Sequence, residues 1–91
     1  MTDFDAEIGR LCLSKAGRDQ GRYFIVKEVI DENYVYVVDG MMRKLAAPKK
    51  KKRKHLAMKP MVFAGIAEKF AAGVKVFDAE IASAIISSTT E

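Results

Sequence analysis

Short apolar segments with the character of β-strands recur through the first 60 residues of the chain. Leu11 and Leu13 alternate with other residue types, and the segments 23–30 and 34–38 are rich in β-branched and aromatic side chains. A hydrophobic period of two and this choice of residues are typical of strands. Lys27 interrupts the apolar run of the second segment, so we expect a bulge there. These segments predict a sheet of short strands.

Turn residues separate the strand segments. Residues 31–33, Asp-Glu-Asn, follow the second segment, and Asp39-Gly40 follows the third. Asp and Asn bond their own backbone, and Asp-Gly is a strong hairpin signal, so both stretches predict tight turns. We expect a short fourth strand over 42–45 and a last one over 55–58. Five short strands joined in this way predict a small barrel.

Six consecutive cations occupy residues 49–54, in a chain whose formal net charge is +4. Residues 1–60 carry 14 cations against 8 anions, whereas residues 61–91 carry 2 against 4. A block of like charge repels itself, and Pro48 just before it cannot donate a backbone hydrogen bond. We therefore predict a solvated basic loop over 48–55 that meets an anionic partner.

The hydrophobic period changes to that of a helix after Pro60. Val62, Ile66 and Phe70 recur at helical spacing, and Gly73 is well placed to end the helix that they predict. This segment also carries little of the positive charge that distinguishes the first two-thirds of the chain. We therefore expect residues 61–91 to differ in structure and in role from residues 1–60.

A second short helix is predicted to begin at Asp78, which is a candidate N-cap, with Ile81 and Ile85 on one face. Each of the two helices would make about three turns, too few for an isolated helix to be stable. We therefore predict a helical extension over 61–91 that packs on or beside the β-rich part, 1–60.

The chain offers few residues suited to catalysis or metal binding. Cys12 and His55 are its single cysteine and single histidine, and they lie far apart in the sequence. A zinc site or a Cys/His catalytic pair is therefore not expected. We read Cys12 as a small buried strand residue and expect no enzymatic activity, no cofactor, no metal and no small-molecule substrate.

The length and composition are those of one small globular domain. Apolar residues make up 49% of the 91 residues, which excludes disorder for the chain as a whole. The longest apolar run is far shorter than the roughly 18 residues that a membrane span needs. The first nine residues are acidic and do not resemble a secretory signal. We expect a cytoplasmic protein that does not enter a membrane.

Residues 15–22, "KAGRDQGR", combine cations with backbone freedom. Lys15, Arg18 and Arg22 lie in a predicted hairpin loop that two glycines bracket. Backbone amides in a turn can form an anion-binding concavity, and Arg binds phosphate with a planar fork of donors. Asp19 does not suit that purpose, and we read it as an internal ion-pair or turn partner. The alternative interpretation of this stretch is an ordinary solvated loop.

Residues 8–40, "IGRLCLSKAGRDQGRYFIVKEVIDENYVYVVDG", resemble the KOW motif of several ribosomal proteins and transcription elongation factors. The continuation "DGMMRKLAAPKKKKRKHL" resembles eukaryotic-type large-subunit ribosomal proteins fourteen and twenty-seven and their small bacterial KOW-domain relatives. Residues 64–85 are similar to their helical tail. The resemblance implies an SH3-like five-stranded barrel over 1–60, two short C-terminal helices, and a mainly β fold with C-terminal α.

The resemblance also implies a non-catalytic protein that binds structured RNA, with ribosomal RNA of the large subunit as its partner. Gly21 would be the characteristic glycine of the motif, and Gly17, Arg18 and Arg22 match the loop that the family presents to RNA. Together with the basic character of the chain, this gives a set of candidate RNA-binding residues. They are Lys15, Gly17, Arg18, Gly21, Arg22, Lys27, Arg43, Lys44, Lys49, Lys50, Lys51, Lys52, Arg53, Lys54 and His55.

Three questions stay open at the level of sequence. Base discrimination could come from RNA shape or from a base stacked on Tyr23, Tyr34 or Tyr36, although tyrosines in strands also serve as packing residues. The apolar helices over 61–91 could complete the core or contact a protein partner. The run "PKKKKRK", residues 48–54, also resembles a nuclear import signal, and this is a further alternative.

Overall fold

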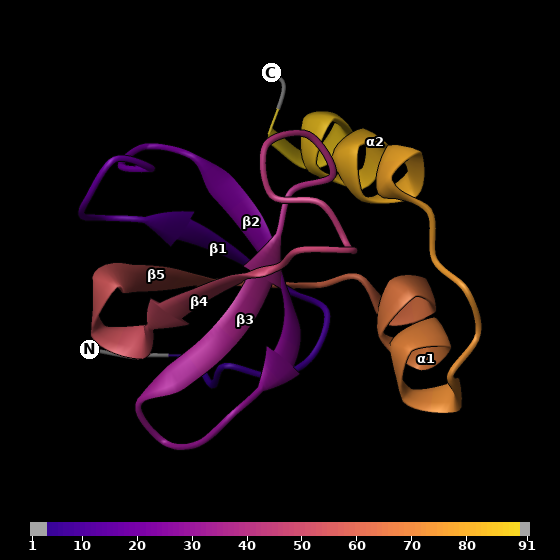
Figure 1. Cartoon of the computed structure of the whole chain (residues 1–91), viewed down its shortest axis with the longest axis horizontal. Coiled ribbons are helices and arrows are strands. Elements are labelled where there is room, and N and C mark those ends of the chain that lie inside the picture. Colours follow the sequence, from indigo (N-terminus) through magenta and orange to yellow (C-terminus); the bar gives the residue numbers. More distant parts are fainter. Residues whose placement is uncertain (1–3, 90–91) are drawn as a thin grey trace.

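A curled, five-stranded antiparallel sheet followed by two helices makes up the described residues, 4–89, of the computed structural model (Figure 1). The strands run in the order β4-β3-β2-β1-β5. The fold class predicted from the sequence, mainly β with C-terminal α, is confirmed. The elements are β1 (Arg10–Ser14), β2 (Tyr23–Val29), β3 (Tyr34–Val38), β4 (Lys49–Lys52), a short 3₁₀ helix η1 (Arg53–His55), β5 (Leu56–Val62), α1 (Ala64–Ala72) and α2 (Asp78–Thr89).

Neighbouring strand residues point to opposite sides of the sheet, and each side contributes to a hydrophobic cluster. Phe24 and Val26 of β2 belong to one cluster, inside the curl of the sheet, whereas Ile25 between them belongs to a second cluster. The second cluster also holds Ile81 and Ile85 of α2. The helices therefore cover the outer face of part of the sheet, as Figure 1 shows.

The helix η1 carries the chain from one edge strand of the sheet, β4, to the other, β5. The backbone N–H of Lys15 donates to His55 O at 2.8 Å, and the N–H of Arg53 donates to Asn33 O, also at 2.8 Å. These bonds tie η1 to the loop after β1 and to the turn before β3. The loop and the turn lie at opposite ends of β2, so η1 runs between them and is bonded to both.

Two irregularities bend the strands. The pairing of β2 with β3 shifts between Val26 and Glu28, which confirms the bulge predicted at Lys27. The pairing of β1 with β5 shifts between Arg10 and Cys12, at the level of Pro60. Proline lacks the donor that a regular ladder needs, so it is accommodated where the pairing is interrupted.

The basic loop predicted over 48–55 is wrong for most of its length, because Lys49–Lys52 form β4 and pair with Tyr34–Val38. Alternation along a strand sends successive ammonium groups to opposite faces, which relieves the repulsion that argued for a loop. An edge strand also leaves most of its lysines in contact with water, and lysines are common on edge strands. Of the four lysines only Lys51 is buried.

The fourth strand predicted over 42–45 is also wrong, because this stretch forms turns. Asp39 Oδ1 accepts hydrogen bonds from the backbone N–H groups of Met41 and Arg43 at 2.9 and 2.8 Å, which closes a tight turn instead of a strand. The last strand, predicted over 55–58, begins at Leu56 and continues to Val62.

Both predicted helices are confirmed, and Gly73 ends α1 in a left-handed conformation as expected. Asp78 is the first residue of α2, and the predicted N-cap role is not what its side chain does. Its Oδ1 accepts a hydrogen bond from the backbone N–H of Leu45 at 2.7 Å. This contact joins α2 to the segment between β3 and β4, where Gly40 approaches Asp78 so closely that a Cβ at position 40 would overlap its carbonyl.

Candidate nucleic-acid interface

The loop between β1 and β2, residues 15–22 and called the β1–β2 loop from here on, is closed by its own backbone. Gly21 N–H donates to Ser14 O at 2.9 Å, and Arg22 N–H donates to Asp19 O at 2.9 Å. Gly17 and Gly21 have φ of 81° and 87°, a region that residues with a Cβ rarely adopt, and the space around both is open. The glycines thus permit a tight turn, and the side chains of Lys15, Arg18 and Arg22 are exposed on it.

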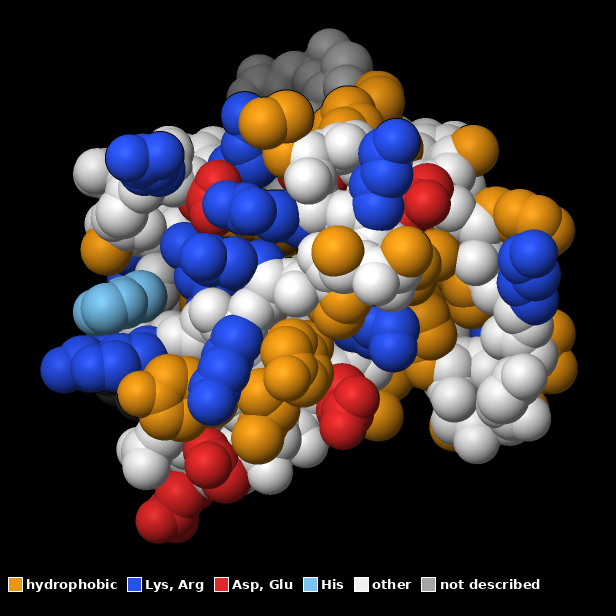
Figure 2. Space-filling view, viewed as in Figure 1, with side chains coloured by type: hydrophobic (Ala, Val, Ile, Leu, Met, Phe, Trp, Pro, Cys, Tyr) orange, Lys and Arg blue, Asp and Glu red, His pale blue; other side chains and the backbone are white. Residues whose placement is uncertain are grey.

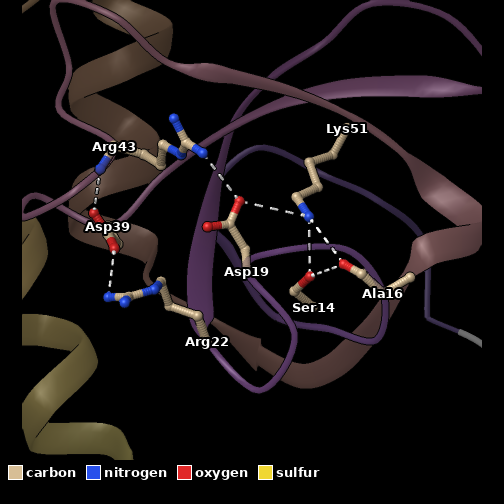
Figure 3. A network of polar contacts seen from close by, with 7 residues as sticks. All are labelled: Ser14, Ala16, Asp19, Arg22, Asp39, Arg43 and Lys51. Atoms are coloured by element: carbon tan, nitrogen blue, oxygen red, sulfur yellow. Dashed lines mark hydrogen bonds and ion pairs between the residues drawn. The ribbon is translucent and has the colours of Figure 1, made fainter.

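Asp19 points inward from this loop and is nearly buried. Its Oδ2 lies 3.4 Å from Arg43 Nη2 and 3.7 Å from Lys51 Nζ (Figure 3). Lys51 Nζ also donates to Ser14 Oγ at 3.0 Å and to Ala16 O at 3.4 Å. The sequence-based interpretation of Asp19 as an internal ion-pair partner is confirmed, and the β1–β2 loop is fixed to β4 through it.

Asp39 makes a second connection at the other end of this network (Figure 3). Its side chain is fully buried, and its Oδ1 holds the N–H groups of Met41 and Arg43. Its Oδ2 makes no hydrogen bond among the described residues but lies 3.8 Å from Arg22 Nη1. Arg22 is 43% exposed, so it can balance the buried carboxylate while part of its guanidinium still faces water.

Two members of this network could not be recognised from the sequence. They are Ser14, which bonds Lys51, and Asp39, which lies beside Arg22, so each positions a cation of the candidate site. Asp39-Gly40 did signal the turn, but nothing local signals that the carboxylate is buried beside Arg22. Contacts between residues so far apart in the chain depend on the register of the sheet.

The candidate RNA-binding residues fall into three groups in the structure. Lys51 is buried and Arg43 is half-buried, and both are engaged with Asp19. Lys27 lies on the helical side of the molecule, where its Nζ is 5.9 Å from the centre of the Phe70 ring. The others belong to the strands, to η1 or to the loops of the sheet: Lys15, Gly17, Arg18, Gly21, Arg22, Lys44, Lys49, Lys50, Lys52 and Lys54 are exposed, and Arg53 and His55 are half-buried. Arg18 and Arg22 also line a hollow with Ile85 and Thr89 of α2.

Exposed cations therefore gather over the sheet and its loops rather than over the helices. Figure 2 shows most of the Lys and Arg side chains on this half of the molecule, with acidic side chains at the tip of the β2–β3 hairpin. On the outer face of β3 and β4, Tyr36 lies opposite Lys50 and Tyr34 lies opposite Lys52. Lys50 Nζ lies 4.6 Å from the centre of the Tyr34 ring. The face thus combines positive charge with half-buried aromatic rings.

Two hollows open beside η1, and both are lined by Arg53 and Lys54. The first has a volume of about 430 Å³ and also includes Phe4, Lys15 and Met58 in its lining. The second, called the Tyr34 hollow from here on, has a volume of about 380 Å³. Its lining consists of Glu32, Asn33, Tyr34, Lys52, Arg53 and Lys54.

Cys12 and the acidic residues form neither a reactive thiol site nor a metal site within residues 4–89. Burial raises the pKa of the Cys12 thiol to about 12, so it stays protonated and is a poor nucleophile. Between residues 4 and 89, His, Cys, Asp and Glu form no group of three or more that could hold a metal ion. In the same range, neither helix has the length and apolar character needed to cross a bilayer.

The fold and the interface together define a small basic β-sheet protein with a helical tail and a cation-rich end. Curated proteins named large ribosomal subunit protein eL14 are similar to part of it. That of Methanococcus vannielii is 42% identical over 38 residues, which are 42% of this chain and 48% of that protein. That of Hyperthermus butylicus is 40% identical over 45 residues, which are 44% of this chain and 46% of that protein.

A third such protein, from Desulfurococcus amylolyticus, is 52% identical over 31 residues, which are 34% of this chain and 32% of that protein. The chain thus spans about half, or less, of the length of the curated relatives that it matches. No family model matches the chain. The resemblance to large-subunit ribosomal protein fourteen is confirmed as this partial similarity, which covers 31–45 residues of the chain.

Proposed function

We propose that this chain is a non-catalytic RNA-binding protein that associates with the large ribosomal subunit and contacts structured ribosomal RNA. The observation that carries the proposal is the β1–β2 loop, where Lys15, Arg18 and Arg22 are exposed on a tight turn that Asp19 anchors from inside. The partial similarity to curated eL14 proteins supports the setting. In this setting the protein would be cytoplasmic and would need no cofactor.

The electrostatics of the sheet end support binding to a polyanion. Each phosphate contact by a Lys or Arg releases counterions. The logarithm of the affinity therefore falls linearly with the logarithm of the salt concentration, with a slope of about −0.7 to −0.9 per contact. Such contacts supply affinity and orientation but carry no sequence information. Because Asp19 engages Lys51 and Arg43 internally, we assign the phosphate contacts to the exposed cations of the β1–β2 loop, β4 and η1.

Changing both Arg18 and Arg22 to Ala is expected to weaken binding to a large-subunit ribosomal RNA fragment about tenfold at ~0.1 M salt, which corresponds to about 1.4 kcal/mol. The salt dependence of log affinity should become shallower by roughly 1.5, because two phosphate contacts are lost. Fluorescence anisotropy across a salt series measures both quantities. Thermal melting by circular dichroism checks that the fold survives the loss of the Arg22 ion pair with Asp39.

The matched control changes Lys69 and Lys75 to Ala, which removes the same charge from the helical side. Lys69 forms an ion pair with Glu80 at 2.6 Å, and Lys75 lies over the Phe77 ring, so neither belongs to the β1–β2 loop. This control should bind RNA within about twofold of the wild type, since long-range attraction between exposed charges is screened at this salt. If both double variants lost the same amount of RNA affinity, the effect would come from net charge alone, and the proposed loop contact would be contradicted.

A protein partner for residues 61–91 is the second candidate role. Val74 and Phe77 lie in the link between the helices and are more than half exposed. Met42, in the segment between β3 and β4, is exposed to 68%. Exposed apolar side chains of this size can mark a docking site. We do not favour the nuclear import reading of 48–54, because an import signal is read as an extended peptide and Lys49–Lys52 are paired with β3.

A further inference from the structure

The Tyr34 hollow lies between the turn of the β2–β3 hairpin and η1. Glu32 and Asn33 come from the turn, Tyr34 begins β3, and Lys52 ends β4. Arg53 and Lys54 come from η1. Two segments that are distant in the sequence, 32–34 and 52–54, therefore form one concave surface of about 380 Å³.

Short hydrogen bonds fix the shape of this hollow. Asp31 Oδ1 accepts from the N–H groups of Asn33 and Tyr34, each at 2.8 Å, which sets the turn. Across the hollow, Arg53 N–H donates to Asn33 O at 2.8 Å, and Arg53 Nη1 donates to Glu32 O at 3.2 Å. Because the guanidinium is held by a backbone carbonyl, the hollow is largely formed before a ligand arrives, and less ordering entropy is lost on binding.

The lining combines three kinds of group that a nucleotide needs. The aromatic ring of Tyr34 offers a stacking surface for a base. Three cations, against the single carboxylate of Glu32, give the hollow a net positive charge that suits phosphate. The side-chain amide of Asn33 makes no hydrogen bond within residues 4–89, so its donors and its acceptor are available to the edge of a base.

We propose that the Tyr34 hollow holds a single unpaired nucleotide of the bound RNA. The base packs against the ring of Tyr34 with its edge toward Asn33, and the adjacent phosphates are held by Lys52 and Lys54. Lys50 lies over the Tyr34 ring without lining the hollow, so the base would use the part of the ring that Lys50 leaves open. The inference rests on the proposed RNA-binding function but uses a site separate from the β1–β2 loop, and it assigns a base contact as well as phosphate contacts.

The test compares strands of equal charge with and without bases. The probes are 12-nucleotide oligoadenylate, 12-nucleotide oligouridylate and a 12-unit abasic ribose-phosphate strand, each labelled for anisotropy at ~0.1 M salt. Wild-type protein is expected to bind the better of the two base-bearing strands about tenfold more tightly than the abasic strand, since stacking of one base contributes about 1–3 kcal/mol. Tyr34→Leu, which keeps apolar volume in the strand, should abolish this preference and leave affinity for the abasic strand unchanged.

Three further variants locate the effect. Tyr34→Phe keeps the ring and should keep the preference. Tyr36→Leu removes the neighbouring ring on the same face, outside the hollow, and should keep it as well. Lys52→Gln with Lys54→Gln should weaken binding of all three strands alike, because it removes phosphate contacts only. Thermal melts of each variant show whether the fold is intact before affinities are compared.

Other outcomes overturn the inference in distinguishable ways. Equal affinity of wild-type protein for the base-bearing and abasic strands, with ribosomal RNA still bound, would remove the base contact and leave the proposed function standing. An equal loss of preference in Tyr34→Leu and Tyr36→Leu would move the contact out of the hollow. Adenosine monophosphate bound as tightly as the 12-mer would make the hollow a site for free nucleotides. If neither ribosomal RNA nor any strand were bound, the proposed function would fail together with the inference.

Discussion

Replacing Asp19 by Ala is expected to lower the free energy of unfolding by about 2–3 kcal/mol, a shift of roughly 10–20 °C in Tm for a domain of this size. The change removes the carboxylate that faces Lys51, whose side chain is only 9% exposed. A buried charge without a partner is costly, although the hydrogen bonds of Lys51 to Ser14 Oγ and Ala16 O lessen the cost here. Chemical denaturation monitored by circular dichroism measures the difference.

A second substitution separates this explanation from general damage to the β1–β2 loop. In Asp19→Ala with Lys51→Met, both charges are replaced by groups that need no partner, so most of the lost stability should return. Glu28→Ala, which removes an exposed carboxylate from β2, should change stability by less than about 0.5 kcal/mol. A double variant no more stable than Asp19→Ala alone would contradict the role given to the Asp19–Lys51 pair.

The same pair shows what the sequence could predict and what it could not. Features set by neighbouring residues were predictable: the glycine-bracketed loop, the turn at 31–33, the bulge in β2 and the left-handed end of α1 at Gly73. Each depends on local backbone preferences or on the hydrophobic period. The secondary structure of residues 49–52 does not follow from such local features. Repulsion between the lysines predicts a loop as long as the strand that pairs with them is unknown.

What turns that run into β4 is its contact with distant residues. Val35 and Val37 offer a strand to pair with, and Asp19 offers a carboxylate for the one lysine that points inward. The identity of these partners follows only from the register of the sheet. The candidate site shows the same contrast between local features and distant contacts. Its cations could be found from the sequence, but which of them are internal and which are exposed could be seen only in the structure. The Tyr34 hollow could not be found at all, since it joins a turn to η1.

A chain that ends after Phe63, so that β5 is complete and both helices are missing, is expected not to fold to a stable monomer. Leu11, Ile25 and Val38 would lose the cover that Ile81 and Ile85 of α2 provide. Burying one such side chain contributes about 1.5–3 kcal/mol, and several are exposed together, so the loss approaches the roughly 5–15 kcal/mol that stabilises a whole domain.

Analytical ultracentrifugation and circular dichroism of the truncated chain would then show aggregation or a disordered spectrum. Ile81→Ala in the full chain supplies a graded control, with an expected loss of about 2–5 kcal/mol and no change in the surface proposed to face RNA. A truncated chain that stayed folded, monomeric and competent to bind RNA would contradict this expectation. In that case residues 61–91 would be an accessory that is free to serve a protein partner, whereas aggregation would mean that the helices stabilise the sheet on which the proposed RNA-binding loops depend.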